Sequence, residues 1–266
     1  MKSRIRKFVE DPAKYLPIAR KMAQQSLCRP LQDTAFYMQG QMDINPKSRW
    51  HSDEFASSVG GFYPVGRAEN RKICNLEPWD NTRRDMLILL LRTIITKDIP
   101  GEFAEIGVYQ GSTARLIHHY APERRLHLFD TFEGFTDRSV AAEQDNVNYA
   151  VDSAHFADTS LERVAAAIAA SNDNVAFHQG YFPDSIPPGF EEQTYAFVHL
   201  DADLYEPTFQ GLTFFYPRMA TNGLFVVHDY NAWPGARKAV DDFFADKPEL
   251  VIPMPDKSGS AVIAKR

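Results

Sequence analysis

The stretch "FAEIGVYQGSTARLI", Phe103–Ile117, joins an apolar run to a helix-like segment through two glycines. The run Phe103–Val108 predicts a buried strand, and Ser112–Tyr120 predicts a helix. Gly107, near the end of the strand, and Gly111, just before the helix, mark the turn, where glycine lets the backbone pass close to a ligand. The free N–H groups at the start of the helix would suit a carboxylate or a phosphate. A tight strand–helix turn without a ligand would have the same sequence.

Apolar runs and helical segments alternate along the rest of the chain. Further strands are predicted at Leu126–Phe129, Val175–His178, Ala196–Leu200 and Leu224–Val227, and further helices at Asn81–Lys97, Leu161–Ala170, Pro207–Tyr216 and Gly235–Ala245. This alternation predicts an α/β fold with a Rossmann-like, mostly parallel sheet and helices on both faces. Two short apolar runs near the C-terminus, in "ELVIPMP" and "SGSAVIAKR", predict an antiparallel hairpin at a sheet edge.

Composition limits the classes of protein to which the chain can belong. Its 266 residues suffice for one large domain, and 44% hydrophobic residues are ordinary for a soluble globular enzyme. The net charge of −6 argues against broad nucleic-acid binding. The most apolar run, Met86–Leu91, is too short for a transmembrane helix. Cys28 and Cys74 form neither a disulfide framework nor a metal-ligand cluster, so we expect a cytoplasmic protein.

Residues 1–75 differ from the rest of the chain. Their weak periodicity and many turn formers predict an N-terminal arm of short helices and loops, with residues 76–266 as the Rossmann-like domain. Residues 1–30 carry eight Lys or Arg side chains against Glu10 and Asp11. This basic segment is most simply a solvated helix face, although it could contact anionic lipid or a partner.

An acid ends the second predicted strand, at the sheet edge where ligands bind in open parallel sheets. Asp130 stands about 20 residues beyond the glycine turn, where an acid can accept hydrogen bonds from ribose hydroxyls. The interval from Gly107 to Gly111 is not that of the dinucleotide fingerprint. Together the turn and the acid favour a ligand that carries a nucleoside.

More ionisable residues follow the fourth and fifth predicted strands. They are Asp201, Asp203, His228 and Asp229. Such a group is costly unless it binds a cation or transfers protons. Asp203 could alternatively cap the helix that follows it, and His228 beside Asp229 could serve as a base or a ligand.

Five segments, taken in order, resemble the macrocin O-methyltransferase family. They are "GEFAEIGVYQGSTARLI", "LHLFDTFEGF", "HQGYFPDSI", "HLDADLYEPTFQGL" and "VVHDYNAWPGARKAVDDFF", and the match runs from about Pro78 to the C-terminus. The resemblance implies an S-adenosylmethionine-dependent O-methyltransferase that acts on a hydroxyl of a sugar or another small natural-product acceptor. It also implies a lid and oligomer contacts in the variable N-terminal region, hence a possible homodimer.

The resemblance further implies the residues of the site. Those around the cofactor would be Glu105, Gly107, Gly111 and Ser112 at its methionine part, Asp130, Thr131 and Phe132 at its ribose, and Gly180, Tyr181 and Phe182 by its adenine. In the family pattern a magnesium ion is held by an acid, here Asp201, and by two consecutive acids before a tyrosine, here His228 and Asp229. We expect these three residues to be catalytic.

One acid of the family's metal pattern is replaced by His228, and magnesium prefers oxygen ligands. Two alternatives follow: either Asp201 and Asp229 still hold a metal, or His228 is a general base without one.

Two other functions are open to this sequence. A NAD-dependent oxidoreductase is disfavoured by the missing third glycine and by the C-terminal hairpin. A non-catalytic cofactor-binding or membrane-associated module would use the basic N-terminus instead. The acceptor is not identified, although aromatic residues of the arm could line its pocket; they are Phe36, Tyr37, Trp50, Phe62 and Tyr63.

Overall fold

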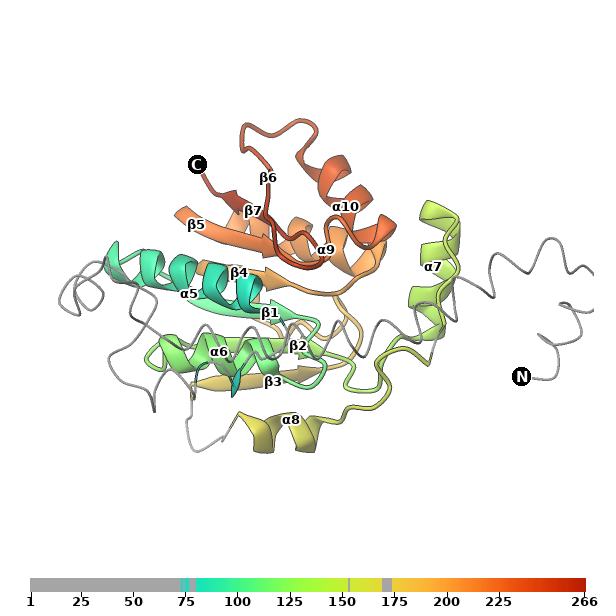
Figure 1. Ribbon diagram of the computed structural model, residues 1–266, viewed down its shortest axis with the longest axis horizontal. Helices are drawn as coiled ribbons and strands as arrows, with labels where there is room; N and C mark the ends of the chain where they lie inside the picture. The colour runs from blue at the N-terminus through green and yellow to red at the C-terminus, as the bar shows by residue number, and fades with distance from the viewer. Residues whose placement is uncertain (1–72, 74, 77–79, 153, 169–173) are drawn as a thin grey trace, which may run out of the picture.

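A computed structural model describes residues 73, 75–76, 80–152, 154–168 and 174–266. Within them, seven strands form one sheet in the order β3-β2-β1-β4-β5-β7-β6 (Figure 1). The strands are β1 (Glu102–Ile106), β2 (Leu126–Asp130), β3 (Val175–Gln179), β4 (Tyr195–Leu200), β5 (Met219–Val227), β6 (Ile252–Pro253) and β7 (Ala261–Ala264). The first five are parallel, and β7 is antiparallel to both β5 and β6. The predicted Rossmann-like sheet and its C-terminal hairpin are therefore confirmed.

Helices cover both faces of this sheet. They are α5 (Asn81–Thr96), α6 (Ser112–Tyr120), α7 (Asp137–Val147), α8 (Leu161–Ala167), α9 (Tyr205–Phe215) and α10 (Pro234–Phe244), with 3₁₀ turns η1 (Phe190–Glu192) and η2 (Tyr216–Arg218). Figure 1 shows α5 and α6 on one face and α9 and α10 on the other. Successive residues of β1 divide between the two cores: Phe103 packs with α5 and α6, and Ala104 with α9 and α10.

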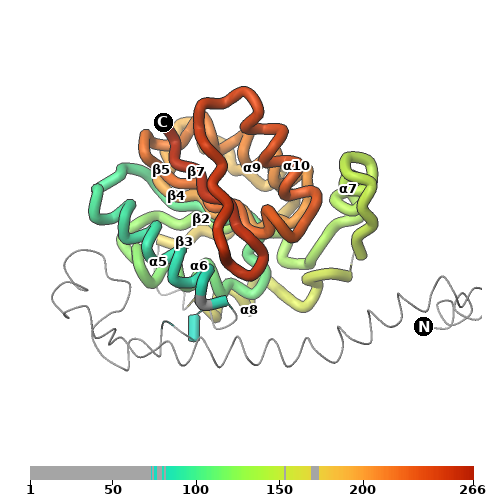
Figure 2. The backbone as a smooth tube through the Cα atoms, turned by 45° about the horizontal axis from the view of Figure 1, so that its top comes forward, coloured from blue at the N-terminus to red at the C-terminus, as the bar shows by residue number. Residues whose placement is uncertain are grey.

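The predicted elements agree closely with the observed ones, with one exception. Helix α6 has the predicted bounds, and the predicted strands differ from the observed ones mainly at their ends. Helix α7 was not predicted; it lies beyond the carboxyl ends of the parallel strands (Figures 1 and 2). The basic segment and the aromatic residues of the predicted arm lie outside the described residues. No helix in the described part of the chain is long and apolar enough to cross a bilayer.

The start of α5 is fixed from two sides. Its N-cap is Asp80, whose side chain accepts a hydrogen bond of 3.0 Å from the backbone N–H of Arg83. The second carboxylate oxygen of Asp80 accepts from the backbone N–H of Lys257, in the loop between β6 and β7, over 2.7 Å. This double anchor holds the first turn of α5 beside the carboxyl ends of β4 and β5.

Candidate active site

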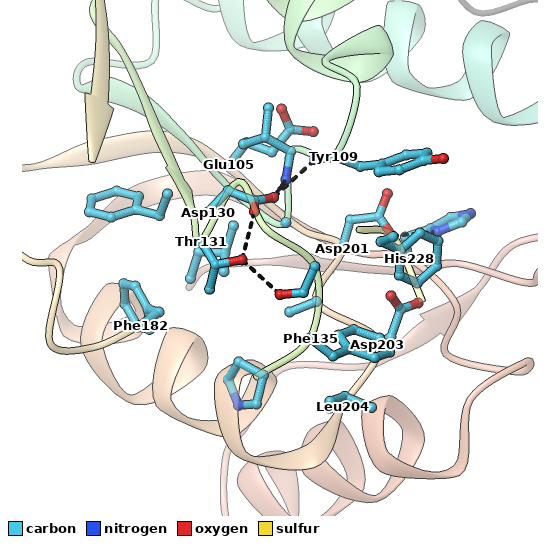
Figure 3. Close-up of a pocket in the computed structure, with 18 of the residues that line it drawn as sticks. Glu105, Tyr109, Asp130, Thr131, Phe135, Phe182, Asp201, Asp203, Leu204 and His228 are labelled. Carbon is cyan, nitrogen blue, oxygen red and sulfur yellow. Dashed lines mark hydrogen bonds and ion pairs between the residues drawn. The ribbon is translucent and has the colours of Figure 1, made fainter. Parts of the chain in front are cut away.

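A cavity of about 260 Å³ opens at the carboxyl ends of β1, β2, β4 and β5 (Figure 3). All but two of the residues predicted for the site line it. Those that do are Glu105, Gly107, Ser112, Asp130, Thr131, Gly180, Tyr181, Phe182, Asp201, His228 and Asp229. The cavity is also lined by Tyr109, Phe135 and Phe156, which the sequence did not indicate. The structure thus brings residues from the ends of β1, β2, β4 and β5, and from the loops that follow the strands, to the same cavity.

The two remaining predicted residues, Gly111 and Phe132, do not line the cavity. Gly111 is the N-cap of α6 in a left-handed conformation (φ +79°), and a Cβ atom there would come within 3.0 Å of Val164 in α8. The side chain of Phe132 is buried in the core, and its ring centroid is 6.2 Å from that of Phe177. Both residues therefore shape the loops around the cavity from outside it.

Asp130 connects the glycine turn to β2. Its Oδ2 accepts hydrogen bonds from the backbone N–H groups of Val108 and Tyr109, over 2.6 and 2.9 Å. Its Oδ1 accepts from the backbone N–H of Phe132 over 2.7 Å. The Thr131 hydroxyl also lies 3.4 Å from Oδ1, but it donates its single proton to the carbonyl of Gly134 over 2.8 Å. A carboxylate offers about four lone-pair positions, so about one remains for a ligand hydroxyl.

Gly107 allows the ends of β1 and β4 to touch. Its φ is +82°, and a Cβ atom at this position would lie 2.0 Å from the carbonyl oxygen of Asp201. No side chain can occupy that space without separating the strands. Glycine here allows the glycine turn to approach Asp201, a contact that the sequence interpretation did not specify.

Four polar side chains form a cluster at the ends of β4 and β5. The Nδ1 atom of His228 lies 2.7 Å from Oδ1 of Asp201 and 3.2 Å from Oδ2 of Asp229. On the other side of the ring, Nη1 of Arg83 lies 2.9 Å from Nε2 and 3.4 Å from Oδ2 of Asp201. Both ring nitrogens of His228 are therefore engaged. Arg83 was not predicted, because it lies 145 residues before His228 in the chain.

The cluster strongly shifts the ionisation of its members. Burial raises the pKa of Asp201, but its interactions with His228 and the positive charge of Arg83 outweigh burial and hold it below the usual range. Burial lowers the pKa of His228, and the Asp201 carboxylate raises it. The Arg83 contact opposes this rise, since its N–H group can donate to Nε2 only while that nitrogen carries no proton. Proton uptake at Nε2 therefore requires Arg83 to move away.

Asp203 is a buried partner of this cluster and does not cap a helix. Burial, followed by a hydrogen bond with Asp229, raises its pKa well above the usual range. The N-cap of α9 is Leu204, without a side-chain hydrogen bond, so the alternative reading of Asp203 as a cap is wrong. We infer that a protonated Asp203 donates to Asp229.

Glu143 of the unpredicted helix α7 lies at the N-termini of both α9 and α10. Its Oε2 accepts from the backbone N–H of Tyr205 over 2.7 Å, and its carboxylate packs against Gly235 in the first turn of α10, where a Cβ atom would come within 2.2 Å of Oε1. An acid at two helix N-termini is favoured by both helix dipoles. Glu143 thereby fixes the loops that follow β4 and β5.

The same cluster can be tested for its fit to magnesium. One potential ligand atom from each of Asp201, His228 and Asp229 lies within 4.8 Å of the others. However, one of these atoms is an imidazole nitrogen, and the guanidinium of Arg83 already contacts two of the three residues. Magnesium takes oxygen ligands and dehydrates reluctantly. The arrangement in this structure does not fit Mg²⁺.

Comparisons with known proteins agree with this architecture. The family model described as Macrocin-O-methyltransferase (TylF) matches residues 80–263. Demethyldecarbamoylnovobiocin O-methyltransferase of Streptomyces niveus is 28% identical over 166 residues, which cover 57% of this chain and 61% of that protein. The 8-demethyl-8-(2,3-dimethoxy-alpha-L-rhamnosyl)-tetracenomycin-C 4'-O-methyltransferase of Streptomyces olivaceus is 26% identical over 246 residues, 86% of this chain and 84% of that protein.

Solved structures show the same fold. The O-methyltransferase NovP superposes with a TM-score of 0.58 at 21% identity, over 90% of this chain and 98% of that one. The calicheamicin methyltransferase CalS11 superposes with a TM-score of 0.55 at 20% identity, over 85% of this chain and 91% of that one. At such identities the likeness concerns the fold alone. Because the family model covers most of its length, the chain belongs to the macrocin O-methyltransferase family.

Proposed function

We propose that this protein is an S-adenosylmethionine-dependent O-methyltransferase that methylates a hydroxyl of a sugar or another small natural-product acceptor. One observation carries the proposal: the glycine turn, Asp130 and the cluster around Asp201 line the same cavity. Membership of the family supports it, as do the names of the relatives, which describe O-methyltransferases of such compounds.

The donor side of the cavity has groups that suit this cofactor. The backbone N–H groups at the start of α6, beside Ser112, would face the carboxylate of its methionine part. Asp130 has capacity for a ribose hydroxyl, and Gly180 with Phe182 would lie by the adenine. When bound, the cofactor supplies a methyl group on an electron-poor sulfonium. The chain's own residues orient it and exclude water.

On the acceptor side, the hydroxyl must lose its proton as it attacks. Asp201 and Asp229 offer carboxylate oxygens at the cavity wall that can accept a hydrogen bond from this hydroxyl and orient it. Because the pKa values of both carboxyl groups are lowered, they would pass the proton on to solvent rather than keep it. The Asp201 side chain is the more exposed of the two, at 21% against 10%. His228 has both ring nitrogens occupied, so we assign it to holding Asp201 rather than to contacting the acceptor. Mg²⁺ has no step in this proposal.

The test measures release of S-adenosylhomocysteine with a panel of glycosylated natural products. Asp201→Asn and Asp229→Asn should each lower kcat by about 100-fold or more, because they remove the proton acceptor or its partner. Binding of S-adenosylhomocysteine, measured by calorimetry, should change little in both variants. The exposed Asp246→Asn serves as the matched control. Near wild-type rates in both site variants would refute the assignment, and binding of NAD in place of S-adenosylhomocysteine would refute the function.

A further inference from the structure

We propose that Arg83 and His228 together take the place of a divalent cation in this chain, so that methyl transfer is independent of Mg²⁺. The inference rests on the proposed O-methyl transfer and concerns the same cavity. Its basis is the hydrogen-bond geometry of four side chains from α5 and from the ends of β4 and β5.

The first step concerns the position of Nδ1 of His228. This atom lies between the two carboxylates, 2.7 Å from Asp201 Oδ1 and 3.2 Å from Asp229 Oδ2. A cation shared by Asp201 and Asp229 would have to bind between the same oxygens. An N–H group at Nδ1 already donates there and satisfies the carboxylates without an ion.

The second step concerns the tautomer. A metal bound to Nδ1 of His228 would need the lone pair of that nitrogen, and the ring proton would then be on Nε2. Nε2 lies 2.9 Å from Nη1 of Arg83, and a guanidinium nitrogen is only a donor. Two N–H groups would face each other at that distance. The buried Oδ2 of Asp256, at 3.9 Å, is too far from Nε2 to accept a hydrogen bond from it. Metal ligation through Nδ1 and the observed position of Arg83 therefore exclude each other.

The third step concerns charge and anchoring. Arg83 keeps its positive charge at any pH at which the protein is folded, and its Nη1 is 3.4 Å from Oδ2 of Asp201. The turn that carries it is held by the N-cap Asp80, which is itself bonded to the loop after β6. The guanidinium is thus a fixed cation beside the carboxylate. Its planar N–H groups could orient an acceptor oxygen and stabilise negative charge on it, as a metal would.

The decisive experiment measures metal binding directly and does not depend on turnover. Full-length protein is titrated with Mg²⁺ by calorimetry and with Mn²⁺ by electron paramagnetic resonance. We expect no stoichiometric binding by the wild type at millimolar ion. The double variant Arg83→Gln/His228→Asp restores an all-oxygen set of ligands and should bind one ion at least tenfold more tightly. Adding Asp201→Asn to that variant is the matched control and should abolish the binding.

A wild type that binds one Mg²⁺ or Mn²⁺ stoichiometrically at millimolar ion would overturn the inference. This result is independent of methyl transfer, so a failure of the proposed function would be seen separately, as absence of turnover. If the double variant does not fold, as judged by circular dichroism, the wild-type titration still decides. Where turnover is observed, EDTA should change the rate less than twofold, and a requirement for added Mg²⁺ would also overturn the proposal.

Discussion

The backbone N–H of Val108 donates to Oδ2 of Asp130 over 2.6 Å, so the turn after β1 is held by the acid that ends β2. The N–H of Tyr109 donates to the same oxygen over 2.9 Å. Tyr109 has a positive φ of 50°, which a non-glycine residue adopts at a cost. The two hydrogen bonds help to offset that cost. Asp130 is therefore part of the frame of the turn as well as a candidate ligand for ribose.

We expect Asp130→Asn to weaken binding of S-adenosylhomocysteine by about 10- to 100-fold, or about 1.4 to 2.8 kcal/mol. The amide nitrogen of Asn would face a backbone N–H, either at Phe132 or at the glycine turn, and one of these hydrogen bonds would be lost. Calorimetric titration measures the effect. Glu133→Gln, an exposed change in the same loop, is the control. An unchanged dissociation constant would show that the turn keeps its shape without Asp130.

Glu143 should be important for stability although it is remote from the glycine turn. Glu143→Ala would remove the acceptor of the Tyr205 N–H at the start of α9 and the carboxylate packed beside the start of α10, and we expect a loss of about 2 to 3 kcal/mol in the free energy of unfolding. Burial raises the pKa of Glu143, which reduces the difference between the acid and an amide. Glu143→Gln should therefore cost less, about 1 kcal/mol.

Urea denaturation gives these free energies. The adjacent exposed change Gln144→Ala is the control and should stay within about 0.5 kcal/mol of the wild type. Equal losses for Glu143→Ala and the control would show that solvent replaces the carboxylate at both helix ends.

The sequence predicted the sheet because its central strands are buried on both faces. β4, for example, is buried throughout, so it appears in the sequence as an uninterrupted hydrophobic segment apart from His199. Helix α7 has no such signal, since its buried side chains are the polar Ser139 and Glu143. Without an apolar stripe there is no period to detect.

The candidate site was predicted where it follows strand ends and missed where it depends on tertiary contact. Asp130 and Asp201 come directly after apolar runs, and Asp229 comes one residue later, so their meeting at one sheet edge follows from topology. The approach of Arg83 depends on how α5 packs across the sheet, and it lies 118 residues before Asp201 in the chain. No local pattern near Arg83 indicates that partner.

The histidine pair in β2 and β3 predicts a pH dependence of stability. Burial, and after it the charges of His127 and Arg125, lowers the pKa of His178 to about 4 in the folded state. In the unfolded chain the ring has its ordinary pKa of about 6.5, so that state binds more protons between these values. The contribution of His178 to the free energy of unfolding is therefore greatest above about pH 6.5, where the ring is neutral in both states, and decreases as the pH falls towards 4.

His178→Phe should remove this loss, because the phenyl ring retains the stacking on Phe129 and cannot titrate. The fall in unfolding free energy should become shallower by up to about 1.4 kcal/mol per pH unit in that window. Denaturant titrations at successive pH values measure it, with His155→Phe as an exposed control. Parallel curves for His178→Phe and the wild type would contradict the assignment.

Gly107 and Gly189 have similar φ angles, so alanine substitutions at the two positions can distinguish the cost of the left-handed conformation from the cost of a steric clash. Gly107 has φ +82° and Gly189 has φ +90°, but a Cβ atom at Gly107 would lie 2.0 Å from the carbonyl oxygen of Asp201, whereas one at Gly189 would meet nothing within 4 Å. Alanine at Gly189 should cost only the left-handed conformation, about 1 to 2 kcal/mol. Alanine at Gly107 must also separate the ends of β1 and β4, so the loss in the free energy of unfolding, measured by urea denaturation, should exceed the loss at Gly189 by about 2 kcal/mol or more.

Because the separation displaces Asp201 from the glycine turn, Gly107→Ala should also weaken S-adenosylhomocysteine binding, and Gly189→Ala should not. Equal losses of stability at the two positions would mean that β1 and β4 can move apart freely. The close packing of the glycine turn against Asp201 would then not be required by the fold.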